Sequence, residues 1–193
     1  MIPIGPLMRE HRLIEHMIGL MKSEVSKIAG DGKADAVFIE TAVDFFRTYA
    51  DRCHHGKEED LLFAQLRGKS LSPDNEKIMS ELIEEHKIGR KTVRDLLDAG
   101  GRYKGGSAAA LDEIKELLSF LIDFYPAHII KEDKSFFFPC MDYFTKPELD
   151  LMLDRFWEFD RKMIHEKYAH TIAELEKTRL TGSQGTPPAF RII

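Results

Sequence analysis

The sequence predicts an all-α protein: an up-down four-helix bundle with an additional C-terminal helix and a short tail. Apolar residues recur at spacings of three and four along five segments of the chain, which is typical of amphipathic helices. Glycine, proline and serine gather between these segments, and no segment alternates apolar and polar residues as a half-buried strand would. We therefore expect one helical domain over residues 1–178 and a flexible tail over residues 179–193.

Composition narrows the classes of partner and compartment. The chain of 193 residues is 43% hydrophobic, enough for one good core, and its net charge is −5 with both signs interspersed. No basic face predicts a nucleic-acid or membrane partner, and no run of about 18 apolar residues could span a bilayer. The chain begins without the pattern of a secretory signal, and Cys53 and Cys140 form no disulfide framework. These features favour a cytoplasmic protein.

The first helix is expected to begin after Gly5-Pro6, because proline suits the first turn, and to run until Gly30-Asp31-Gly32. His11 lies on its apolar stripe, between Leu7 and Ile14. His16 falls about 140° around the helix from His11 and is expected in solvent. Taken alone, His11 is explained most simply as a hydrogen-bonded core histidine.

The second helix, expected over residues 34–66, carries His54 and Glu58 on its apolar side. Residues four apart lie one turn apart on the same face, so both side chains point toward one place. A carboxylate there must be paired, because a lone buried charge is costly. His55 lies about 100° from His54 and needs a local distortion of the helix to point inward. Gly56, unfavourable within a helix, predicts close approach of a neighbouring element.

The third and fourth helices each place a histidine on the apolar stripe. The third begins with Ser72 as its cap and Pro73 in its first turn, and carries His86. The fourth is expected to be capped by Ser107, to kink at Pro126 and to close in an aromatic plug of Phe136, Phe137 and Phe138. It repeats the spacing of the second helix, with His128 followed by Glu132.

The fifth helix is expected from the capping box Thr145-Lys146-Pro147-Glu148 to about Thr178. It should lie against the outside or one end of the bundle. It packs either on its own bundle or on a second copy, which leaves a homodimer open. His165 lies at the edge of its apolar stripe.

Together, these positions place imidazoles and carboxylates from four helices in what could be one layer of a bundle core, where bundles build metal sites. A pair of divalent ions would compensate them. Imidazole suits iron and zinc, and carboxylates can bridge two ions about 3.5–4 Å apart. Zinc or another divalent metal would accept a similar set of ligands. The preference for iron comes from the arrangement and from the resemblance that follows.

The order His, His-x-x-x-Glu, His, His-x-x-x-Glu resembles the hemerythrin-like (HHE cation-binding) family. The matching stretches are Glu10-His11-Arg12, His54-His55-Gly56-Lys57-Glu58-Glu59, Glu85-His86 and His128-Ile129-Ile130-Lys131-Glu132-Asp133. The resemblance implies a four-helix bundle holding two iron ions, carboxylate- and oxo-bridged. It implies as metal ligands His11, His54, Glu58, His86, His128 and Glu132.

Two departures separate the sequence from the oxygen-carrying hemerythrins. Those proteins have a His-x-x-x-His pair on the third helix, whereas Leu82 precedes His86 here, and their fourth helix uses a more widely spaced aspartate. One imidazole is therefore missing unless His55 or His165 supplies it, and His55 is the better substitute because it adjoins His54. A site with fewer imidazoles should favour Fe(III), which favours peroxide or nitric oxide chemistry, or sensing, over oxygen carriage.

Three functions remain open. The leading one is a di-iron protein that binds or senses O2, NO, peroxide or iron, with a small diatomic or peroxide ligand as its partner. The second is an enzyme that decomposes peroxide or reduces NO at the same centre. The third is a helical interaction module with structural histidines.

Two other families of metal protein do not fit the spacing. Ferritin-like proteins use Glu-x-x-His, whereas this chain has His-x-x-x-Glu. The zinc-protease motif His-Glu-x-x-His fails because His170 lies one residue beyond the position that the motif requires after His165.

Overall fold

The computed structural model describes residues 2–161 and 164–181, and all regular structure within these ranges is helical. The all-α prediction is therefore confirmed for them. The helices are α1 (Ile4–Asp31), α2 (Ala36–Phe45), α3 (Ala64–Leu66), α4 (Pro73–Lys104), α5 (Ala110–Lys131), α6 (Phe137–Met141), α7 (Lys146–Asp160) and α8 (Ile164–Thr181). Three π-helical segments interrupt them: η1 (Phe46–His55), η2 (Glu58–Phe63) and η3 (Glu132–Phe136).

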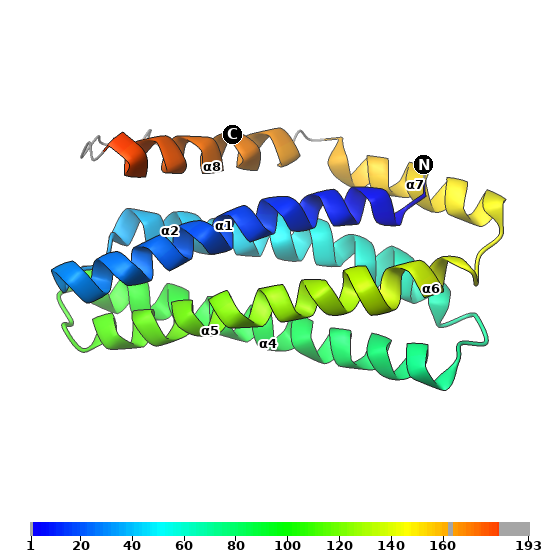
Figure 1. Ribbon diagram of the computed structural model, residues 1–193, viewed down its shortest axis with the longest axis horizontal. Coiled ribbons are helices and arrows are strands. Elements are labelled where there is room, and N and C mark those ends of the chain that lie inside the picture. The colour runs from blue at the N-terminus through cyan, green and yellow to red at the C-terminus, as the bar shows by residue number, and fades with distance from the viewer. Residues whose placement is uncertain (1, 162–163, 182–193) are drawn as a thin grey trace.

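The described helices form long rods that lie side by side (Figure 1). The first rod is α1. The second rod consists of α2, η1, η2 and α3 in succession. The third is α4, and the fourth consists of α5, η3 and α6. Helix α1 contacts α5, α5 contacts α4, α4 contacts α2, and η1 returns to α1, so the rods enclose a common interior. Helices α7 and α8 lie outside this group, where α8 packs on α1 and η1 and α7 packs on η2.

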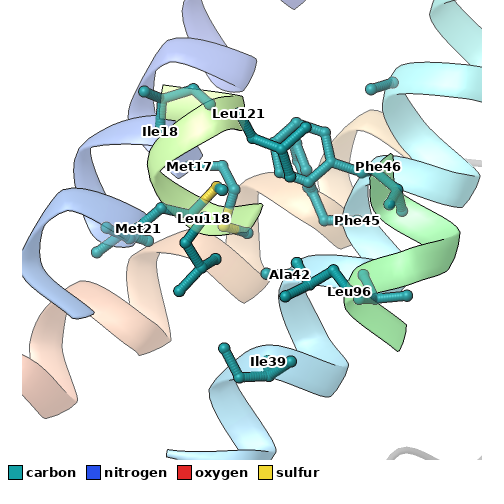
Figure 2. Close-up of a cluster of buried hydrophobic side chains, with 14 of the residues drawn as sticks. Met17, Ile18, Met21, Ile39, Ala42, Phe45, Phe46, Leu96, Leu118 and Leu121 are labelled. Atoms are coloured by element: carbon teal, nitrogen blue, oxygen red, sulfur yellow. The ribbon is translucent and has the colours of Figure 1, made fainter. Parts of the chain in front are cut away.

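Apolar side chains fill both ends of the interior. At one end, residues of α1, α2, α4 and α5 pack together, among them Met17, Phe45, Leu96, Leu118 and Leu121 (Figure 2). At the other end, Leu7, Phe63, Leu82 and Phe136 are fully buried, and Phe156 of α7 belongs to the same buried cluster. Burying each such side chain stabilises the fold by roughly 1.5–3 kcal/mol. Along α1, His11 falls between the end that holds Leu7 and the end that holds Met17, so a polar layer separates the two.

Several helix ends form as the sequence predicts. Ser72 accepts a hydrogen bond from the backbone N–H of Asn75, with Pro73 in the first turn, and Thr145 and Glu148 form the expected capping box. Gly32, at φ 66°, ends α1 in the left-handed conformation that glycine adopts most easily. The predicted Ser107 cap was wrong: α5 begins at Ala110 without a side-chain cap, because the carbonyl of Ser107 instead closes a turn with the Ala110 N–H.

The fifth predicted helix is divided in two, since α7 ends at Asp160 and α8 begins at Ile164. The break lets Asp160 and His165 both face the second rod, where they contact Lys57 and Tyr49 respectively. This stretch of the sequence contains no glycine or proline from which the break could have been predicted.

The aromatic plug at the end of the fourth rod was predicted one residue too long. Phe136 and Phe137 are buried, but Phe138 is 55% exposed, because three consecutive helical residues cannot all face one side. Helix α5 continues through Pro126.

The C-terminal boundary and the membrane prediction have separate outcomes. Helix α8 extends to Thr181, and the rest of the predicted tail, residues 182–193, lies outside the described residues.

Among the helices that are described, none combines the length and the apolar character needed to cross a membrane.

Candidate metal centre

The polar layer consists of histidine and glutamate side chains that are almost completely buried. None of them is more than 3% exposed, although all carry groups that water would solvate well. In one group His11, His54, Glu58 and Glu132 bring ligand atoms within 4.8 Å of one another, and in a second group His55, His86 and His128 do so. The structure thus brings together the six residues predicted as ligands, and it adds His55.

The two glutamates connect the two histidine groups. Glu58 places Oε1 3.3 Å from Nε2 of His54 and Oε2 3.4 Å from Nε2 of His86. Glu132 places Oε2 3.1 Å from Nε2 of His11 and Oε1 3.3 Å from Nε2 of His128. Each carboxylate therefore directs one oxygen to each group. This is the arrangement in which a carboxylate can bridge two cations.

These inward atoms have no hydrogen-bond partners among the described residues. The unpartnered atoms are both carboxylate oxygens of Glu58 and of Glu132 and the Nε2 atoms of His11, His54, His86 and His128. A buried polar atom left unpaired costs about 1–3 kcal/mol, and native proteins hold few of them. Eight such atoms facing one space fit a donor set that cations would satisfy.

An outer layer of charged residues holds the four imidazoles in place. The Nδ1 atoms of His11, His54 and His128 each lie 2.8 Å from a carboxylate oxygen, and that of His86 lies 2.6 Å from one. Each carboxylate also contacts a basic side chain, which offsets its charge. The four sets are His11–Asp133–Arg12, His54–Glu10–Lys57, His86–Glu59–Arg90 and His128–Glu85–Lys131.

This outer layer fixes the tautomer of each imidazole. An ionised carboxylate can only accept a hydrogen bond, so the neighbouring Nδ1 carries the proton and donates it. In the neutral imidazole, the form that binds a metal, the Nε2 atom then presents its lone pair to the interior. Carboxylates that orient histidines in this way are a regular feature of metal sites, where they also raise the basicity of the ligand.

The π-helical segments position the inward side chains. His54 and His55 end η1, Glu58 begins η2 and Glu132 begins η3. The wider π-helical turn is rare and is found frequently at functional sites. In η1 it allows two consecutive histidines to face the interior: the ring of His55 stacks on that of His86, with centroids 3.9 Å apart. The local distortion that His55 was expected to need is thus present.

Gly56 allows α7 to approach the second rod closely. A Cβ atom at this position would lie 3.4 Å from the ring of Phe159, in van der Waals contact, so little room remains for a side chain beyond Cβ. The close approach predicted from Gly56 is confirmed.

The surroundings shift the pKa values of the two glutamates in opposite directions in the metal-free protein. Burial raises the pKa of Glu58 well above its usual range, and the neighbouring Glu132 raises it further. Burial alone would also raise the pKa of Glu132, but His128 and His11 outweigh it and lower that pKa well below its usual range. Burial, with the charge of His11, lowers the pKa of His54 to about 4. Two adjacent carboxylates cannot both ionise here without added positive charge.

His165 lies apart from the inward residues, in the outer layer. Its Nε2 atom is 2.6 Å from Asp160, and its Nδ1 atom is 2.9 Å from the hydroxyl of Tyr49. Asp160 in turn lies 2.8 Å from Nζ of the fully buried Lys57, which also contacts Glu10. His16, expected in solvent, is 62% exposed.

Sequence reasoning assigned no role to the outer acids, although a signal was present. Glu10 and Glu85 directly precede His11 and His86, and the other two, Glu59 and Asp133, directly follow the inward glutamates. An acidic residue adjoining each candidate ligand was therefore visible. Lys57 and Asp160 gave no comparable signal, because their pairing depends on how α7 returns to the bundle.

The family model of the hemerythrin HHE cation binding domain matches residues 3–137, which include all seven inward histidines and glutamates. No curated protein and no solved structure matches the chain.

Proposed function

Because the chain belongs to the hemerythrin HHE cation-binding domain family, we propose that its buried histidines and glutamates hold a pair of iron ions. The proposed ligands are His11, His54, His55, Glu58, His86, His128 and Glu132. The protein would bind or sense a small ligand at this centre, within the up-down four-helix arrangement typical of the family. Zinc or another divalent metal could occupy the same donors.

One observation carries the proposal: each inward glutamate directs one oxygen to each histidine group, and none of these oxygens has another partner among the described residues. A structural role for the histidines would leave eight buried polar atoms unsatisfied. A pair of divalent cations would satisfy them and would allow both carboxylates to ionise.

The ligand set that includes His55 has five imidazoles and two carboxylates. This set is no longer one imidazole short, so the reason to favour Fe(III) and to set O2 aside is weakened. We therefore keep O2, NO and peroxide as candidate ligands. Two iron ions would supply a redox-active centre, while the chain orients the imidazoles, excludes water and balances charge through the outer acids and bases.

The experiment that tests this proposal is metal analysis of protein isolated without added zinc or nickel. We expect about two irons per chain and a visible iron charge-transfer band. His54→Ala and Glu132→Ala should remove the iron, and His16→Ala, at an exposed position, should retain it. Iron-free protein whose spectrum and stability do not respond to added iron would refute the assignment.

The second candidate function is an enzyme at the same centre. A pocket that reaches His55 from the surface would give a substrate access. Turnover of peroxide or NO by the iron-loaded protein would support this candidate, and binding without turnover would favour sensing or carriage.

A further inference from the structure

A pocket of about 430 Å³ lies beside the candidate centre, between η1, α4 and α5. Its walls include Arg47, Asp51, Arg52, Arg90 and Arg94, and His55 lies among its lining residues. The volume is many times the roughly 30 Å³ that one water occupies in the liquid. The pocket can therefore admit a small solute together with some of its hydration shell.

The pocket has a surplus of positive charge. Arg90 is neutralised, because it lies 2.6 Å from both Asp51 and Glu59. Arg47, Arg52 and Arg94 are exposed, and no carboxylate in residues 2–161 or 164–181 lies within ion-pair distance of them. In a chain whose net charge is −5, these guanidinium groups gather around the mouth of one pocket.

His55 differs from the other inward histidines in its surroundings. It is 3% exposed, and its Nδ1 atom has no hydrogen-bond partner in the described part of the chain. The nearest carboxylate, Asp51, is 3.5 Å away and is already held by Arg90. The chain therefore leaves the pocket side of the centre without the acid that orients each of the other four imidazoles.

We propose that this pocket is the entrance through which a small inorganic anion reaches the His55 side of the centre. The proposal rests on the proposed metal site for its destination. Guanidinium groups present several N–H donors in a plane and bind oxyanions well. The stacked rings of Phe46 and Tyr125, with centroids 4.7 Å apart, form an apolar wall that concentrates the field of the arginines.

The first test compares a charged with an uncharged probe on the iron-loaded protein. Stopped-flow absorbance would follow the binding of nitrite and of NO to wild type, to the Arg47→Gln/Arg94→Gln variant and to Arg67→Gln, whose arginine is exposed at the end of α3. We expect the double variant to bind nitrite about tenfold more slowly at low ionic strength and to lose the salt dependence of that rate. Its NO rate should stay at the wild-type value, as should both rates of Arg67→Gln.

The second test has a readout that needs no metal. Chloride in the pocket of the metal-free protein should broaden the ³⁵Cl NMR line, nitrite should reverse the broadening by competition, and Arg47→Gln/Arg94→Gln should abolish it. Broadening that depends on these arginines in a protein that binds no iron would sink the metal site while supporting the anion site. Iron binding with nitrite rates unchanged by the double substitution would overturn the entrance.

Discussion

Nδ1 of His128 lies 2.8 Å from Oε2 of Glu85, an acid carried by the neighbouring rod α4. The same relation holds for His11, His54 and His86. In each case, the carboxylate that contacts Nδ1 comes from a different rod, and it directly adjoins a proposed ligand on that rod. Glu85 adjoins His86, whose own Nδ1 is held by Glu59 beside Glu58. These hydrogen bonds therefore link each rod to the next in a closed ring. Displacing one rod would disturb proposed ligands on two rods.

Glu85→Gln should weaken iron binding about 10–100-fold, the range seen when an outer acid of a metal site is lost. The amide cannot hold Nδ1 of His128 as an ionised carboxylate does. Glu81→Gln is the matched control, because Glu81 contacts the same Lys131 without touching His128. Competition with a chelator of known affinity would give both constants, and equal affinities for the two variants would contradict an orienting role for Glu85.

His55→Gln should leave about one iron per chain, because the group of His55, His86 and His128 loses a donor while the other group stays intact. Iron analysis with the visible spectrum would measure this loss. His16→Gln, at an exposed histidine, should retain the wild-type iron content. Full iron occupancy in His55→Gln would remove His55 from the ligand set.

The sequence predicted much of the fold and most of the candidate layer from helical periodicity. His11, His54, His86 and His128 stand on apolar stripes, so their convergence followed from the packing of amphipathic helices. The inward direction of His55 could not be read in this way, because an α-helix turns adjacent residues about 100° apart and only the π-helical η1 brings both histidines inside. No local pattern encodes that segment.

The positions of α7 and α8 also depended on tertiary contacts. The break after Asp160 involves no glycine or proline. Lys57, the ion-pair partner of Asp160, cannot be distinguished by sequence from a solvated lysine. The structure places that lysine at 0% exposure, between two carboxylates.

Removal of metal should lower the melting temperature by at least about 5 °C. A ligand present at 100 times its Kd stabilises the folded state by about 2.7 kcal/mol, and 1 kcal/mol shifts the melting temperature of a chain of this size by roughly 2–4 °C. In addition, Glu58 would stay buried beside Glu132 without the positive charge of a cation. Calorimetry with and without a chelator, followed by addition of iron, would measure the effect. An unchanged, reversible transition would instead support histidines with a purely structural role.

Asp160→Ala should destabilise the protein by about 2 kcal/mol, because the buried ammonium of Lys57 loses one of its two carboxylates. Glu158→Ala is the control on the same helix, where the side chain is 64% exposed and makes only a long contact with Arg161. Chemical denaturation of both variants would compare them. Equal stability would mean that Glu10 alone satisfies Lys57.

The contact between Lys57 and Asp160 has a consequence for how much of the chain makes one autonomous unit. The family match ends at residue 137, yet Asp160 lies beyond it and neutralises a cation at the heart of the outer layer. A fragment trimmed to the matched boundary would expose η2, which α7 contacts, and would leave the buried ammonium of Lys57 with Glu10 as its remaining carboxylate partner. We therefore expect the smallest stable fragment of this protein to extend through α7, beyond the residues that match the family.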